Sequence, residues 1–422
     1  MEDNKFKIGV IGLGYVGLPL AVLFSSKYSV IGLDTNSSRV SKVNQFLDET
    51  NELNSEALQK ALNTNLLVTN KYKDIKDCNI YIVTVPTPID KMKNPDLSYL
   101  LDATKGIGEL ISKGDIIIYE STVYPGCTEE ICVPVLEKIS ALKYNQDFYC
   151  GYSPERINPG DRKNTIDKII KVTSGSNEYA SKKVDELYSS VISAGTYNVS
   201  SIKVAEASKA IENAQRDLNI SFVNELALMF DKMKIDTTEV LDAASTKWNF
   251  LKFRPGLVGG HCISVDPYYL TFKSESMGYS PNVILSGRKV NEQMGEFTAL
   301  KLINLMNDKM IPIKGSKILI LGITYKEDCP DIRNTKIPEV YKFLNEYGAN
   351  VSVHDPYADP KIVYDKYDIK LVNTLNKYDG IILAVGHSSF KDLDYINLKS
   401  QQNTVIFDVK SFLDKNIVDA RL

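Results

Sequence analysis

Residues 7–34 read KIGVIGLGYVGLPLAVLFSSKYSVIGLD, and this stretch decides the fold of the first part of the chain. An apolar run leads into the GxGxxG pattern of Gly12, Gly14 and Gly17, a helix-like segment follows, and a second apolar run ends at Asp34. In such a pattern the first glycine permits a tight turn, and the second lets a pyrophosphate approach the N–H groups of a helix N-terminus. The third allows the helix to pack closely on the strand. The stretch therefore predicts a βαβ unit that binds a dinucleotide.

Asp34 discriminates among the dinucleotides. It ends the second apolar run, about 20 residues after the glycine turn, where an acid accepts a hydrogen bond from a ribose 2′-OH and repels a 2′-phosphate. This favours NAD over NADP. FAD binds through the same glycine pattern and remains the alternative at this point.

The alternation of apolar runs and helix-like segments continues to about residue 130. Short runs rich in β-branched residues, separated by helical patterns, predict a parallel sheet with both faces covered. Ligands bind at the carboxyl ends of such strands. Residues 85–88 (VPTP) and 121–126 (STVYPG) fall at those ends.

A different pattern occupies residues 203–232, where apolar residues recur every three or four positions without glycine or proline. This spacing predicts one long helix of about 45 Å, which is longer than a single domain needs. Such a helix links two domains or forms a subunit interface. After it, the glycine- and proline-rich residues 253–267 predict a loop of the kind that lines active sites.

After Lys314 the strand and helix alternation starts again, and its first apolar run ends at Gly322 without a GxGxxG pattern. We therefore expect an α/β fold with two Rossmann-like parallel-sheet domains joined by a long central helix. The predicted domains are 1–200 for NAD binding, 201–310 for the central helices with the loop of residues 253–267, and 311–422 for a second nucleotide-type unit.

Composition excludes several classes of function. The 422 residues carry 50 Lys plus Arg against 53 Asp plus Glu, too small an imbalance for a protein that mainly neutralises nucleic acid. The six cysteines form no CxxC pair, and the three histidines show no zinc-site spacing, so we expect a reducing compartment and no metal. Residues 8–24 resemble a signal-peptide core, but their glycines and Pro19 argue against one. We expect a cytoplasmic protein without a membrane partner.

Cys262 is the candidate nucleophile. It lies in LVGGHCISVDPYYL, residues 257–270, where Gly259 and Gly260 remove side-chain bulk ahead of the thiol. Asp266 follows four residues later and is suited to orient a base or a water, although acids before proline are also ordinary turn residues. The other five cysteines are interpreted as buried small hydrophobic residues.

Polar residues on the long helix are the second group of candidates. Lys209, Asn213 and Arg216 share one helix face by their spacing. They form either a solvated polar stripe or a group in which Lys209 and Asn213 stabilise an oxyanion beside the thiol. Further candidates lie in loops and are Thr122, Glu155 and Arg156.

Seven motifs in order resemble the UDP-glucose/GDP-mannose dehydrogenase family of NAD-dependent sugar-nucleotide oxidases. They are GLGYVGLPLA, VPTP, ESTVYPGCT, GYSPER, KAIENAQRDLNISFVNELA, PGLVGGHC and YKEDCPDIRNT, and together they span nearly the whole chain. The variants GGHCISVDPYYL and INPGD resemble the branch that acts on UDP-N-acetylhexosamines, above all the UDP-GlcNAc and UDP-GalNAc dehydrogenases of surface-polysaccharide pathways.

The resemblance implies covalent catalysis by Cys262. In the family, the nucleophilic cysteine traps the aldehyde formed at C6 as a thiohemiacetal, which a second oxidation converts to a thioester. Lys209 matches the general acid/base that also stabilises the oxyanion, and Asn213 matches its partner.

Three further positions match supporting roles. Asp266 and Thr122 match groups that orient the lysine and a water, and Glu155 matches the carboxylate that assists thioester hydrolysis. Many family members carry a second acid four residues after that glutamate, where this chain has Pro159. A second-carboxylate role is therefore not expected here.

The resemblance also implies two sets of binding residues. Besides the three glycines, the NAD contacts are matched by Tyr15, Val16, Asp34, Arg39, Thr87, Thr122 and Arg333. The substrate contacts are matched by Glu155, Arg156, Lys209, Asn213, Arg216, Arg254, Gly259 and Lys326. Cations at these positions suit a diphosphate, because planar Arg groups bind phosphate oxygens well.

Some alternatives stay open. The substrate is UDP-GlcNAc or UDP-GalNAc, with UDP-ManNAc or UDP-glucose as the alternative. A simple two-electron NAD-dependent alcohol or hydroxy-acid dehydrogenase would need Lys209 but not Cys262. A nucleotide-sensing module without turnover would be expected to lack a catalytic group, but Cys262, Lys209 and Asn213 are all present. The long helix and the family resemblance favour a homodimer or a higher homo-oligomer.

Overall fold

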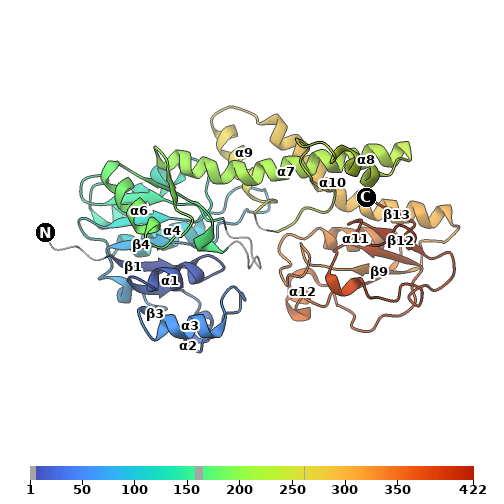
Figure 1. Ribbon diagram of the computed structural model, residues 1–422, viewed down its shortest axis with the longest axis horizontal. Helices are drawn as coiled ribbons and strands as arrows, with labels where there is room; N and C mark the ends of the chain where they lie inside the picture. The colour runs from blue at the N-terminus through green and yellow to red at the C-terminus, as the bar shows by residue number, and fades with distance from the viewer. Residues whose placement is uncertain (1–5, 157–164, 261) are drawn as a thin grey trace. The chain divides into compact units, whose positions relative to one another are not determined.

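The structure is a computed structural model of the 422-residue chain, and it describes residues 6–156, 165–260 and 262–422 (Figure 1). The chain divides into two compact units. The first runs to Glu212 and takes up Tyr268–Gly278, and the second comprises Asn213–Pro267 and Tyr279–Leu422.

The first unit is built on an eight-stranded sheet with the strand order β3-β2-β1-β4-β5-β6-β7-β8. The strands are β1 (Lys7–Ile11), β2 (Ser29–Leu33), β3 (Leu66–Thr69), β4 (Ile80–Val83), β5 (Ile116–Tyr119), β6 (Tyr149–Tyr152), β7 (Lys171–Gly175) and β8 (Thr196–Asn198). All neighbours are parallel except β6 and β7, which pair antiparallel. The strand order reverses at β1, which is where dinucleotides bind on such sheets.

Helices cover this sheet because its central strands are apolar on both faces. Strands β4 and β5 are buried along their whole length. The helices are α1 (Gly17–Ser25), α2 (Ser37–Asn44), α3 (Ser55–Leu62), α4 (Ser98–Gly108), α5 (Val133–Ser140) and α6 (Glu178–Ser189), with short turns at Tyr72–Ile75, Thr128–Cys132 and Ile166–Lys168. Asparagine side chains cap α2, α3 and α6 at their N-termini.

The predicted long helix is α7 (Ile202–Met233), which extends one residue beyond the prediction at each end. Its 32 residues span about 48 Å. Along the chain α7 passes from the first unit to the second, whose boundary lies between Glu212 and Asn213. It is drawn in green in Figure 1.

The second unit contains a five-stranded parallel sheet with the order β10-β9-β11-β12-β13. Its strands are β9 (Lys317–Leu321), β10 (Asn350–His354), β11 (Gly380–Leu383), β12 (Val405–Asp408) and β13 (Ala420–Arg421). The remaining helices are α8 (Thr237–Ala244), α9 (Asp266–Ser276), α10 (Asn282–Asp308), α11 (Ile337–Glu346) and α12 (Pro360–Tyr367), with a short turn at Ser388–Phe390. The predicted fold class, two Rossmann-like sheets and a long central helix, is confirmed. The division into three domains at residues 200 and 310 stays a prediction.

The core of the second unit contains apolar side chains of the helices α10 and α11 and of the sheet. Met294 and Leu302 of α10 and Val340 of α11 belong to it, together with the sheet residues Ile320 and Phe407. Of the helices in the part of the chain that the structure describes, none is long and apolar enough to cross a membrane.

Candidate active site

The glycine turn after β1 has the geometry of a dinucleotide site. Gly12 has a φ of 94°, which a side chain would strain. A Cβ on Gly17 would lie 1.8 Å from the carbonyl oxygen of Gly12, so only glycine allows α1 to approach the turn this closely. A Cβ on Gly14 would meet nothing within 4 Å, which leaves its backbone open to a ligand. Tyr15 and Val16 lie half-buried between these glycines.

Asp34 and Arg39 both hold the backbone of Leu13 inside this turn. Asp34 accepts hydrogen bonds from the N–H groups of Leu13 (2.9 Å) and Asn36 (2.8 Å). Arg39 donates from Nε to the Leu13 carbonyl oxygen (2.9 Å) and pairs with Asp48 at 2.7 Å. Its Nη1 is buried without a hydrogen-bond partner in the structure. The open backbone at Gly14 and this unused donor fit a bound dinucleotide.

The hydrogen bond from Arg39 also affects the pKa of Asp48. Burial alone would raise the pKa of its carboxyl group, but hydrogen bonds from Thr50 and Arg39 bring that pKa below its ordinary value. Arg39 therefore stabilises the glycine turn through its hydrogen bond to Leu13. Sequence reasoning assigned it only a cofactor contact.

The carboxyl ends of β4 and β5 are tied together beside this turn. Thr87 donates from Oγ1 to the carbonyl oxygen of Thr122 (2.7 Å), so two predicted cofactor residues are in direct contact. Tyr269 of α9 donates to the carbonyl oxygen of Thr87 (2.6 Å). This fixes the VPTP loop against the following strand.

Glu155 is only 7% exposed and belongs to a buried ionic cluster. Its Oε2 accepts from Lys171 Nζ at 2.7 Å, and Lys171 also pairs with Glu120 at 2.8 Å. Neither Lys171 nor Glu120 was a candidate from the sequence, because nothing local to either residue marks it. The one available signal was a lysine between two apolar residues, Ile170 and Val172.

Arg156 and Lys209 are placed on or against α7. Arg156 donates from Nη2 to the Ser208 carbonyl oxygen (3.2 Å) and forms an ion pair with Glu212. Lys209 is buried. The side chain of Arg156, a predicted substrate residue, is therefore anchored to the same helix that carries Lys209.

In the second unit, Asn213 and Asp266 meet. Asn213 Nδ2 donates to Asp266 Oδ2 at 2.6 Å, and both side chains are buried. The backbone N–H of Asp266 donates to the carbonyl oxygen of Cys262 at 2.8 Å, which closes a tight turn at the N-terminus of α9. Three predicted catalytic residues are thus linked by consecutive hydrogen bonds.

Cys262 is the one cysteine that is not fully buried. None of the six cysteines, all of which lie within the described residues, forms a disulfide, and the other five are buried as predicted. Burial raises the pKa of the Cys78 thiol to about 12, so this thiol stays protonated and unreactive at neutral pH. An accessible cysteine among buried ones is the expected setting of a nucleophile.

The turn before Cys262 packs against the loop of Tyr325–Thr335. A Cβ on Gly259 would lie 2.9 Å from the carbonyl oxygen of Asn334, and Gly260 has a φ of 80°. Asn334 Nδ2 also donates to the carbonyl oxygen of Gly260 (2.9 Å). Arg333, a predicted cofactor residue, pairs with Asp331 at 2.5 Å on this loop.

A hollow at the carboxyl ends of β9, β11 and β12 brings together two predicted substrate residues, Gly259 and Lys326. Its lining also includes Tyr325, Glu327, Lys336 and Lys410. Lys410 pairs with Glu327 at 3.0 Å. Burial would raise the pKa of Glu327, but the charge of Lys410 holds it below its ordinary value. Sequence reasoning missed Lys410, although its place directly after a strand was a usable signal.

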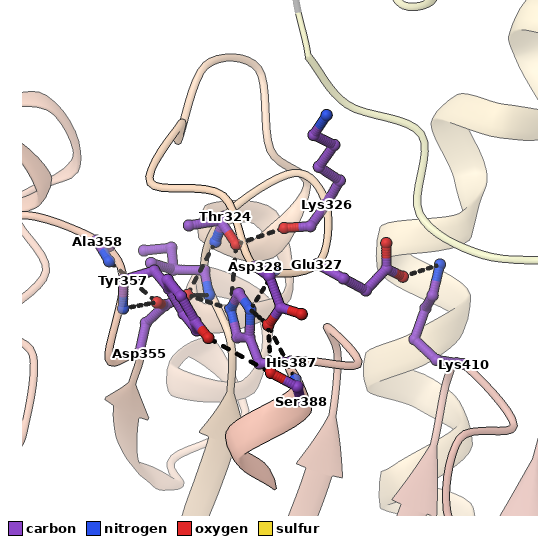
Figure 2. A network of polar contacts seen from close by, with 11 residues as sticks. Thr324, Lys326, Glu327, Asp328, Asp355, Tyr357, Ala358, His387, Ser388 and Lys410 are labelled. Atoms are coloured by element: carbon purple, nitrogen blue, oxygen red, sulfur yellow. Dashed lines mark hydrogen bonds and ion pairs between the residues drawn. The ribbon is translucent and has the colours of Figure 1, made fainter. Parts of the chain in front are cut away.

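A buried histidine holds the loop that presents Lys326 (Figure 2). His387 Nδ1 accepts from the N–H of Asp328 (2.9 Å), which assigns the ring proton to Nε2, and Nε2 lies 3.1 Å from Asp355 Oδ2. Thr324 Oγ1 donates to the Lys326 carbonyl oxygen (2.9 Å). Figure 2 shows the Lys326 side chain extending away from this network.

Two predicted substrate residues lie elsewhere in the second unit. Arg254 pairs with Asp242 of α8, and Arg216 is exposed on α7; neither lines the hollow. Pro159 and His261 lie outside the described residues. Among residues 6–156, 165–260 and 262–422, no group of His, Cys, Asp and Glu is arranged to hold a metal ion.

Comparison with known proteins finds sequence similarity along the whole chain. Residues 6–192 match the NAD binding domain of the UDP-glucose/GDP-mannose dehydrogenase family, residues 203–293 match its central domain, and residues 319–415 match its UDP binding domain.

Individual relatives agree with these matches. The chain is 51% identical to a UDP-N-acetyl-D-glucosamine 6-dehydrogenase of Pseudomonas aeruginosa, over 100% of both proteins. It is also 51% identical to a UDP-N-acetyl-D-glucosamine 6-dehydrogenase of Salmonella typhi, over 99% of both. The solved structure of the UDP-D-ManNAc dehydrogenase from Pyrococcus horikoshii matches with a TM-score of 0.89 at 29% identity, over 99% of this chain and 98% of that one.

Proposed function

Since the chain belongs to the UDP-glucose/GDP-mannose dehydrogenase family, we propose that it oxidises C6 of UDP-N-acetylglucosamine to the carboxylate through a thioester on Cys262. Membership makes it an NAD-dependent oxidoreductase with a UDP-sugar substrate. The choice of sugar rests on the 51% identity to two UDP-N-acetyl-D-glucosamine 6-dehydrogenases, against 29% to the UDP-D-ManNAc dehydrogenase.

NAD is the hydride acceptor for both oxidations when it is bound. Its site in this proposal is formed by Gly12, Gly14, Gly17 and Asp34, with the further contacts at Tyr15, Val16, Arg39, Thr87, Thr122 and Arg333. The open backbone at Gly14 and the unpartnered Nη1 of Arg39 support this assignment.

Side chains of the protein transfer the protons and bond covalently to the carbonyl carbon. Lys209 takes the proton of the C6 hydroxyl as the first hydride leaves. The thiolate sulfur of Cys262 then bonds to the aldehyde carbon, and Lys209 returns its proton to the carbonyl oxygen. Lys209 takes that proton again as the second hydride leaves the thiohemiacetal, which gives the thioester. The partial exposure of Cys262 supports this role.

Hydrolysis completes the reaction. A water oxygen bonds to the thioester carbon, one water proton passes to Glu155, and the carbon–sulfur bond breaks with its electron pair on Cys262. Lys209 and Asn213 donate hydrogen bonds to the oxygen that becomes negative during each addition. The hydrogen bond between Asn213 and Asp266 orients the amide for this purpose.

The hollow with Gly259 and Lys326 is the proposed site of the UDP diphosphate. Lys410 adds a second cation there, and a flexible ammonium suits a phosphate as a point charge. Glu155, Arg156, Arg216 and Arg254 complete the proposed set of substrate residues. The domains keep the proposed boundaries of 1–200, 201–310 and 311–422.

We propose a homodimer formed through α7. Val204, Ile211, Phe222, Met229 and Met233 are 45–57% exposed on this helix. Their spacing of four, seven or eleven residues places them along one face, and an exposed apolar stripe of this kind marks an interface. We further propose a cytoplasmic enzyme whose product serves surface-polysaccharide synthesis, and the free cysteines suit that reducing compartment.

A substrate panel tests the proposed function. NADH formation is followed with UDP-GlcNAc, UDP-GalNAc, UDP-ManNAc and UDP-glucose under identical conditions. We expect the highest kcat/KM with UDP-GlcNAc. A preference for UDP-GalNAc would correct the epimer, and activity confined to UDP-glucose or UDP-ManNAc would overturn the substrate assignment.

A further inference from the structure

Three ionisable side chains are buried together at the carboxyl ends of β5 and β6. Glu120 follows β5 and is 2% exposed, Glu155 follows β6 and is 7% exposed, and Lys171 begins β7 and is 3% exposed. Lys171 Nζ lies 2.8 Å from Glu120 Oε2, 2.7 Å from Glu155 Oε2 and 3.1 Å from the carbonyl oxygen of Pro154. These three acceptors match the three donors of an ammonium group.

The direction of β7 brings these groups together. In the register of the first unit, Tyr152 pairs with Ser174 and Gly151 with Gly175, antiparallel. The first residue of β7 therefore lies beside the residues that follow β6, and Ser153 donates to the Val172 carbonyl oxygen (2.7 Å) in the same ladder. A parallel β7 would have placed Lys171 at the opposite edge of the sheet, away from the ligand side.

The cluster is charged. Burial lowers the pKa of Lys171, but the two carboxylates more than offset this and raise it above its ordinary value, so the ammonium form persists. Burial raises the pKa of Glu120, although Lys171 opposes this. The groups that face Lys171 are Glu120 from β5, Glu155 from β6 and Tyr188 from α6, whose hydroxyl donates to Glu120 and whose ring centroid lies 5.4 Å from Nζ.

We propose that Lys171 is a positioning residue that holds the carboxylate of Glu155 in place to act as the base for thioester hydrolysis. This inference rests on the proposed function, in which Glu155 accepts a proton from the attacking water. A general base needs its accepting oxygen in a fixed place, and a buried carboxylate is fixed by the donors that hold its oxygens. Without the ammonium group of Lys171, the buried side chains of Glu120 and Glu155 would lose the cation that they share.

The geometry also restrains the Glu155 side chain. One of its carboxylate oxygens is held by Lys171, and the other accepts from the backbone N–H of Arg156 at 2.5 Å. Lys171 and this N–H together fix the plane of the carboxylate. Loss of Lys171 would release one of the two oxygens.

The test compares Glu120→Gln with Glu120→Gln/Lys171→Met. The first variant removes one carboxylate and keeps the pair between Lys171 and Glu155. The second differs from it only in the ammonium group, and it avoids leaving two uncompensated carboxylates, as Lys171→Met alone would. Lys171→Arg in the Glu120→Gln background is the charge-retaining variant, and thermal unfolding checks that each variant folds.

Single-turnover kinetics with UDP-GlcNAc and intact-protein mass spectrometry supply the readouts. We expect Glu120→Gln to hydrolyse the thioester within threefold of the unaltered enzyme. The double variant slows hydrolysis about 100-fold, within the range for general-base catalysis, and accumulates the thioester while the KM for UDP-GlcNAc stays within threefold. The arginine variant recovers part of the rate, because it restores a cation beside Glu155.

The variant Glu155→Gln distinguishes a failure of the inference about Lys171 from a failure of the proposed function. If this variant accumulates thioester and the double variant does not, the inference about Lys171 is wrong while the proposed function stands. If Glu155→Gln hydrolyses at the unaltered rate, the proposed role of Glu155 fails and the inference fails with it. A double variant that changes only thermal stability also overturns the inference, because it would show a purely structural lysine.

Discussion

Asn213 Nδ2 donates a 2.6 Å hydrogen bond to Asp266 Oδ2, although 53 residues separate the two along the chain. Asn213 lies on α7 and Asp266 begins α9, so the bond joins the long helix to the turn that carries Cys262. Both side chains are buried. The hydrogen bond to Asp266 therefore fixes the orientation of the Asn213 side-chain amide.

Replacing Asp266 by Leu tests this relationship. Leucine has a similar size but no acceptor, so the buried Asn213 amide loses this hydrogen bond at a cost of about 1–3 kcal/mol. We expect kcat to fall about 10- to 100-fold while the KM for UDP-GlcNAc changes little. Steady-state kinetics measure both constants, and the exposed Asp392→Leu is the control. An unchanged kcat would show that the orientation of Asn213 does not matter.

The glycine turn offers a matched pair of substitutions. A Cβ on Gly17 would lie 1.8 Å from Gly12 O, whereas a Cβ on Gly14 meets nothing within 4 Å. We expect Gly17→Ala to lower the Tm by several degrees, because overpacking costs about 1–3 kcal/mol. Gly14→Ala should keep its Tm and raise the KM for NAD at least about tenfold, because the methyl group occupies the path of the pyrophosphate. Calorimetry and kinetics separate these effects. An unchanged KM for NAD in Gly14→Ala would refute the assignment of Gly14 to the cofactor.

Asp34 is predicted to select NAD. Asp34→Asn keeps an acceptor for the Leu13 N–H and removes the negative charge that repels a 2′-phosphate. The ratio of kcat/KM for NADP to that for NAD should rise about tenfold or more, which corresponds to about 1.4 kcal/mol. Initial rates with both cofactors give the ratio. If it does not change, discrimination resides elsewhere.

Asp115 gives the stability a dependence on pH. Burial raises the pKa of its carboxyl group from 3.8 to about 6. Between these values the folded protein holds a proton that the unfolded chain has released, so the free energy of unfolding falls as the pH rises through this window. Asparagine does not titrate, so the free energy of unfolding of Asp115→Asn does not fall in this window. We expect it to be more stable than the unaltered protein by about 2–3 kcal/mol at pH 8 and equal to it at pH 4.

Thermal unfolding of both proteins at pH 4, 6 and 8 checks this expectation. The Tm difference between them should grow from pH 4 to pH 6 and then level off. A constant difference at all three values would mean that Asp115 does not titrate in this range.

Much of the fold follows from local pattern. The apolar spacing of the long helix predicts 203–232, and α7 covers Ile202–Met233. The restart of strands after Lys314 predicts the second sheet, whose first strand is Lys317–Leu321. Both predictions depend on periodicity within one segment, which sequence displays directly.

The missed residues depend on pairing between distant segments. Lys171 reaches Glu155 only because β7 runs antiparallel to β6. The residues of β7 alone do not predict the direction in which the strand pairs. His387 contacts Asp328 and Asp355 because β11, β9 and β10 lie side by side in the sheet. The residues of the active-site set came mostly from the family resemblance, which carries long-range information that spacing lacks.

The ratio of NADH formed to UDP-GlcNAc consumed tests the central claim most directly. The account predicts two NADH and one UDP-N-acetylglucosaminuronate for each sugar, with no free aldehyde, because Cys262 holds the intermediate until the second oxidation. A ratio of one with release of the aldehyde would contradict it and would leave a simple two-electron dehydrogenase.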